Sequence, residues 1–119
     1  MFIQINISHS DHPIEEFVAL GDEFAEATEG KRTIRRAVGC VGADDPTLRV
    51  VVAFFDSKED AEANSQLPGT DQIASKVMAM IKEDMPQFLN LEVKSDRTFW
   101  GIGPAQKVGD ALKIAQALP

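Results

Sequence analysis

The chain has 119 residues, of which 44% are hydrophobic and 26% are charged, as in a single soluble globular domain. Its formal net charge is −7, with 12 Lys and Arg against 19 Asp and Glu, and this acidity argues against nucleic acid as a partner. No apolar run approaches the roughly 20 residues that span a bilayer, so no membrane-spanning segment is expected.

Residues 2–8 predict a strand, because isoleucines alternate with polar residues that include Gln4 and Asn6. The motif "SDHPIEE" predicts the start of a helix, with a proline in the first turn and two glutamates that favour the helix dipole. An apolar stripe at helical spacing extends this helix to Thr28, and Gly30 follows where a C-cap glycine belongs. The candidate N-caps are Ser10, Asp11 and His12.

Residues 33–41 and 48–55 predict two strands, and the short turn "GADDP" between them predicts an antiparallel hairpin. Ser57, with Asp60 three residues later, predicts a capping-box start to a short helix. The sequence "LPG" ends that helix, and Thr70 is the expected cap of a longer one. Residues 88–94 alternate again as a last strand.

This order of elements predicts an α+β fold, the ferredoxin-like β-α-β-β-α-β plait with a four-stranded antiparallel sheet. Its first and third strands are central, and its helices cover one face. The plait accounts for residues 1–95. Residues 96–119 form a C-terminal extension, in which apolar residues at helical spacing predict a short amphipathic helix anchored by Trp100 on its own or a partner subunit.

The third predicted strand is apolar on both faces. Val50, Val52 and Phe54 fall on one face, and the intervening Val51, Ala53 and Phe55 fall on the other. Burying such a side chain contributes on the order of 1.5–3 kcal/mol, so the face that the helices leave open must also be covered. A second copy of the chain is the simplest cover, and the sequence therefore predicts a homodimer.

The segments "VVAFFDSKEDAEANSQLPGTDQIASKVMAMI" and "PQFLNLEV" resemble the dimeric α+β barrel superfamily, which includes the antibiotic-biosynthesis-monooxygenase-like proteins. The resemblance covers about residues 2–95 and implies two plaits packed sheet to sheet. Monooxygenases of this superfamily carry an asparagine on the first strand, where Asn6 stands, and a tryptophan near the end of the third, where Phe54 or Phe55 stands. The haem-degrading branch adds a histidine on the second helical segment, and this chain has none after His12, so no haem is expected.

The ligand-pocket candidates combine polar anchors with aromatic walls: Asn6, His9, Arg36, Phe54, Phe55 and Trp100. Asn6 would orient a carbonyl or hydroxyl group, and Arg36 would bind an anion or pair with a carboxylate. The motif "HSDH" has too few ligands for a metal, so we expect neither metal nor cofactor. The single cysteine, Cys40, is expected to be buried and inert.

Two functions remain open. The first is a dimer that binds a small apolar or aromatic molecule without a complete catalytic set. The second is a cofactor-free monooxygenase or an isomerase that acts on an aromatic or polyketide-like substrate. The lone cysteine and the absence of a charged, apolar leader in "MFIQINIS" predict a cytoplasmic location.

Overall fold

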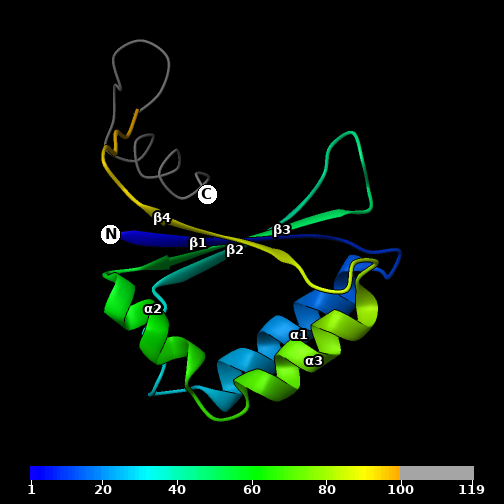
Figure 1. The fold of residues 1–119 in the computed structure, drawn as a ribbon, viewed down its shortest axis with the longest axis horizontal. Coiled ribbons are helices and arrows are strands. Elements are labelled where there is room, and N and C mark those ends of the chain that lie inside the picture. The colour runs from blue at the N-terminus through cyan, green and yellow to red at the C-terminus, as the bar shows by residue number, and fades with distance from the viewer. Residues whose placement is uncertain (100–119) are drawn as a thin grey trace, which may run out of the picture.

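The computed structural model describes residues 1–99, which form a four-stranded antiparallel sheet with helices on one face (Figure 1). The strands are β1 (Phe2–His9), β2 (Arg36–Val41), β3 (Leu48–Phe55) and β4 (Gln87–Glu92), in the order β2-β3-β1-β4. The predicted plait is thereby confirmed, with β1 and β3 at the centre of the sheet.

Three helices cover the same face of the sheet: α1 (Ile14–Ala27), α2 (Lys58–Ser65) and α3 (Thr70–Met80) (Figure 1). Helices α1 and α3 run side by side, and α2 lies near the other end of the sheet. The predicted cap of α2 is confirmed, because the Ser57 hydroxyl accepts a hydrogen bond of 3.1 Å from the Asp60 N–H. None of the helices in residues 1–99 is long and apolar enough to cross a bilayer.

The other predicted N-caps are wrong. Helix α3 begins after Gly69, whose φ of 89° lies in the left-handed region that favours glycine, and Thr70 is already inside the helix. Helix α1 follows Pro13 without a side-chain cap. Its three candidate caps bind elsewhere: the Ser10 hydroxyl donates to the Met80 carbonyl, Asp11 pairs with Lys82, and the His12 ring contacts Glu16.

Strand β2 begins three residues later than predicted, because the chain before it is bound to α2. The Thr33 hydroxyl donates to the Asp60 carbonyl at 2.5 Å, and the Thr33 N–H donates to the Asn64 side chain at 3.3 Å. These bonds hold Thr33 against the helix instead of in the sheet ladder. Only the segment after Arg35 then pairs as a strand with β3.

Register divides the sheet into two faces, because directly opposed residues point the same way. Ile5 lies between Val52 and Leu89, whereas Asn6 lies between Val51 and Phe88. The Asn6 face looks toward the helices. The opposite face, termed here the open face, carries a row of large apolar residues: Ile3, Ile5, Ile7, Val38, Val50, Val52, Phe54, Leu89 and Leu91.

The buried apolar core lies beside α2. It consists of Phe2, Phe55 and Ala61, with Ile34 and Ala53 packed against it. Phe55 is 1% exposed and is the largest fully buried side chain among the described residues. Beneath α1 and α3, by contrast, the helix-facing side of the sheet is incompletely filled. That region holds the candidate site.

Candidate ligand cavity between the sheet and the helices

A cavity of about 350 Å³ separates the sheet from α1 and α3. Its walls are apolar and come from both helices and three strands. They comprise Phe17, Leu20, Phe24, Ile34, Ala37, Val51, Ala53, Ile73, Val77 and Phe88. Five polar residues also line it: Gln4, Asn6, Ser8, Arg49 and Asn64. The composition, mostly apolar with a few polar groups, is typical of small-molecule sites.

The cavity is hollow because small residues face it. Gly21 is on the inward side of α1, and a Cβ added there would meet no atom within 4 Å. Ala37 and Ala53 face each other across the β2–β3 ladder, where larger side chains would fill the space. Empty volume next to apolar walls forgoes dispersion contacts, so the fold gives up stability to keep this cavity.

The floor of the cavity carries two amides from β1, those of Gln4 and Asn6. The Gln4 amide donates a hydrogen bond of 3.1 Å to Asn90 on β4. The Asn6 side chain has no hydrogen-bond partner within residues 1–99 and lines the cavity. Its amide is therefore free to bind a carbonyl or hydroxyl group of a ligand.

Arg49 is the polar residue that the sequence pattern missed. It enters β3 on the helix-facing side, is 8% exposed, and lines the cavity. Its guanidinium donates to the carbonyls of Pro46, Leu48 (3.3 Å) and His12 (2.9 Å), and its Cζ lies 5.6 Å from the centroid of the Phe17 ring. The signal in the sequence was its phase, since Arg49 alternates with the inward-facing Val51 and Ala53.

Asn64 was also missed as a cavity residue, because its position near the end of α2 suggested only local helix-ending bonds. The side chain is 9% exposed, and its Oδ1 accepts the hydrogen bond from the Thr33 N–H. One contact therefore ties the chain before β2 to α2 and places an amide at the cavity wall. The role of Asn64 depends on a contact with Thr33, which lies in a distant segment of the sequence, so the local pattern could not predict it.

No protein-family model matches the sequence, and no curated protein matches it. Solved structures do match the fold. SnoaB from Streptomyces nogalater, a cofactor-independent oxygenase, aligns with a TM-score of 0.67 at 13% identity, over 80% of this chain and 94% of its own. A Deinococcus radiodurans protein named after the antibiotic biosynthesis monooxygenases gives 0.66 at 16% identity, over 85% of this chain and 100% of its own. A conserved protein from Methanosarcina mazei Go1 gives 0.67 at 8% identity, over 78% and 92%.

The chain has the antibiotic-biosynthesis-monooxygenase-like fold. At identities of 8–16%, the likeness to these proteins is one of fold. In this chain the cavity lies on the side of the sheet that the helices cover, and the open face lies on the opposite side.

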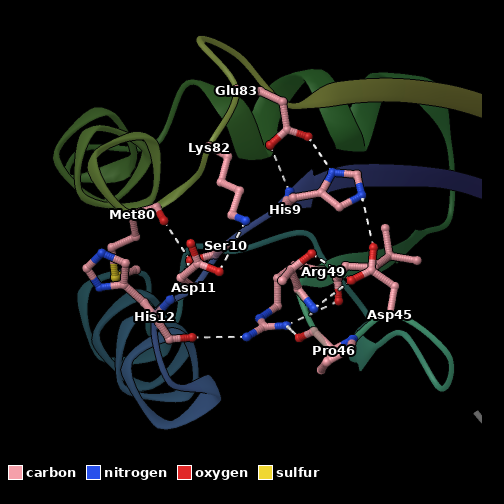
Figure 2. Close-up of polar contacts among 12 residues, drawn as sticks. His9, Ser10, Asp11, His12, Asp45, Pro46, Arg49, Met80, Lys82 and Glu83 are labelled. Carbon is pink, nitrogen blue, oxygen red and sulfur yellow. Dashed lines mark hydrogen bonds and ion pairs between the residues drawn. The ribbon is translucent and has the colours of Figure 1, made fainter.

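His9 lies in a polar cluster at the end of β1 (Figure 2). The His9 ring Nδ1 lies 2.7 Å from a Glu83 carboxylate oxygen, and the His9 backbone N–H donates to the other oxygen at 2.8 Å. These hydrogen bonds lower the pKa of the Glu83 carboxyl. The second ring nitrogen lies 3.7 Å from Asp45. His9 thus joins the turn before β3 to the segment after α3, and it is not among the residues that line the cavity.

The remaining residues of "HSDH" do not converge on one point. Asp11 pairs with Lys82 at 3.1 Å, and the His12 ring contacts Glu16 one turn along α1 at 2.6 Å. Within residues 1–99, no group of three or more His, Cys, Asp or Glu side chains is arranged to hold a metal ion. The expected lack of a metal or cofactor stays a prediction.

The aromatic wall predicted from β3 is placed differently. Phe55 belongs to the core with Phe2, and Phe54 pairs with Ile3 on the open face. Their positions follow from the strand register. The aromatic residues that line the cavity are Phe17 and Phe24 of α1 and Phe88 of β4. Trp100 lies outside the described residues.

Two residues of β2 also differ from expectation. Arg36 is the cross-strand partner of Phe54, which puts it on the open face and away from the cavity. Cys40 is exposed, so the prediction of a buried thiol is wrong. The face of Arg36 follows from the register of β2 against β3, and the exposure of Cys40 follows from the position of β2 at the edge of the sheet.

Proposed function

We propose that this protein is a homodimer that binds a small apolar or aromatic molecule between its sheet and its helices. The observation that carries the proposal is the cavity of about 350 Å³, walled by apolar side chains and floored by the unpartnered amide of Asn6. Ligand pockets commonly measure roughly 300–1,000 Å³, so this one suits a compact ligand of one or two rings.

The dimer is proposed from the open face. Its large apolar side chains lie on the side that the helices leave uncovered, and covering them requires another apolar surface. Proteins with this fold are typically dimeric. Sheet-to-sheet pairing would bury the open faces of both subunits and leave each cavity beneath its own helices.

Isothermal titration with naphthalene-2-carboxamide, a neutral two-ring compound, tests the cavity directly. We expect binding to the wild type with one site per chain. A Gly21→Leu variant projects a branched side chain into the hollow and should abolish this binding. An equal affinity in both proteins would place the ligand outside the cavity.

A cofactor-free monooxygenase is the second candidate, favoured by the free amide of Asn6 and by the likeness in fold to SnoaB, a cofactor-independent oxygenase. Such a reaction would convert an activated ring CH₂ and O₂ into a ring carbonyl and water, with the substrate supplying all four electrons that reduce O₂. An oxygen electrode with anthrone as substrate tests it. Asn6→Ala should abolish any enzyme-dependent uptake of oxygen, while Gln72→Ala, at an exposed position of α3 outside the cavity lining, should leave it unchanged.

A further inference from the structure

Arg49 is a buried cation without an anionic partner among the described residues. Its side chain donates to three backbone carbonyls, those of His12, Pro46 and Leu48. Its Nε is buried and has no hydrogen-bond partner within residues 1–99. A guanidinium has five N–H donors, so the donors of Arg49 are only partly satisfied.

Nearby carboxylates do not balance this charge. The chain has 19 acidic residues, yet within residues 1–99 none forms an ion pair with Arg49. The carboxylate of Asp45 accepts hydrogen bonds from Thr47 and lies near His9. By contrast, the exposed Arg35 donates two hydrogen bonds to Asp56. An unpaired buried charge and an unsatisfied buried donor both cost stability, so Arg49 is held in an unfavourable state that a bound anion would relieve.

The position of Arg49 makes that anion a ligand of the cavity. Arg49 lies directly opposite Ser8 across the β1–β3 ladder, and Asn6 lies on the same face, two residues before Ser8 in β1. All three line the cavity, and neither the Ser8 hydroxyl nor the Asn6 amide has a hydrogen-bond partner within the described residues. The polar groups therefore form one strip along the sheet, with the cation at its end and the apolar walls of α1 and α3 facing it.

We infer that the cavity binds an aromatic carboxylate, with its carboxylate on Arg49 and Ser8 and its ring between the helices and the sheet. This inference rests on the proposed function and narrows its ligand class. The ring of Phe17 packs near the guanidinium of Arg49 and also lines the cavity. It would therefore contact the ligand where its carboxylate joins its ring. The buried Nε is a donor that no group within residues 1–99 satisfies, and the ligand carboxylate supplies a charge-assisted hydrogen bond to it.

A matched pair of probes tests the inference in the wild-type protein. Naphthalene-2-carboxylate is ionised at neutral pH, and naphthalene-2-carboxamide has the same rings without the charge. By isothermal titration the carboxylate should bind more tightly by roughly tenfold to a hundredfold, the range of a charge-assisted hydrogen bond. Equal affinities would overturn the inference and leave the proposed function standing. If neither compound bound, both would fail.

Variants of Arg49 test whether this residue causes the preference for the carboxylate over the carboxamide. Arg49→Met should reduce the carboxylate-to-carboxamide ratio to about one while retaining affinity for the carboxamide, and Arg49→Lys should retain part of the ratio because the charge remains. Arg35→Met removes an exposed arginine and serves as the matched control that keeps the wild-type ratio. A preference that survived Arg49→Met in a folded variant would overturn the inference. If Arg49→Met does not fold, the affinities of the carboxylate and the carboxamide for the wild-type protein decide whether the inference holds.

Discussion

Asn6 on β1 lies directly opposite Val51 on β3, and both side chains line the cavity beneath the helices. The next pair along the ladder, Ile5 and Val52, faces the other way. Adjacent residues of one strand therefore lie on two different surfaces, the cavity proposed for a ligand and the open face proposed for a partner subunit. This alternation allows the two proposed roles to be tested separately.

Val52→Asp should dissociate the dimer, because it puts an unpaired charge into the open face. Light scattering at micromolar concentration should report about twice the chain mass for the wild type and the chain mass for the variant. Val51→Asp is the control, since Val51 faces the cavity and is 41% exposed, and it should remain dimeric. A monomeric wild type would refute the sheet-to-sheet dimer.

Gly21→Ala should stabilise the protein by about 0.5–1 kcal/mol, because alanine restricts the unfolded chain and favours helix more than glycine does. Within residues 1–99, no atom lies within 4 Å of the added methyl group. Urea unfolding measures the change. A destabilised variant would mean that α1 and the sheet lie closer together than the cavity requires.

Phe55→Ala should destabilise the fold by about 3–5 kcal/mol, because it empties the centre of a small core. Phe88→Ala is the matched control, since Phe88 is 55% exposed and its truncation should cost much less. Urea midpoints compare the two variants. Similar losses would contradict the placement of Phe55 in the core and Phe88 at the cavity wall.

Glu83 should make stability depend on pH in the acidic range. Its pKa is lowered in the folded state by the hydrogen bonds from the His9 ring and backbone. The folded state therefore gains stability from Glu83 above the unfolded pKa of about 4.3, and loses it as the pH falls through the lower folded value. Urea midpoints between pH 6 and pH 3 should fall less steeply for Glu83→Gln than for the wild type. The exposed Glu29→Gln should keep the wild-type slope.

The docked extension predicted for residues 96–119 can be followed through Trp100, the only tryptophan of the chain. We expect blue-shifted emission that is protected from acrylamide, because an apolar indole gains from burial. Deletion of residues 105–119 should shift the emission toward that of indole in water. Full quenching in the intact protein would show that the extension does not dock.

The sequence by itself determined the order of elements and the bounds of β3, because both depend on short-range patterns. Residues 50–55 are continuously apolar, the strand is bounded by turn and cap signals, and Ser57 caps α2 through a residue three positions away. The alternation of polar and apolar residues along β1 also places Asn6 on the face opposite the isoleucines. Local periodicity and local hydrogen bonds suffice for these features.

The tertiary structure alone decided which side chains meet. Arg36 and Arg49 both interrupt apolar strands, and the cross-strand register puts Arg36 on the open face and Arg49 in the cavity. The same register sends Phe55 into the core, while the contact between Thr33 and Asn64 depends on residues 31 positions apart. The hollow itself arises from Gly21 on α1 and the small residues of the sheet opposite it, which no single segment reveals. Cavities and buried charges are properties of packing between distant segments, and only the folded chain brings those segments together.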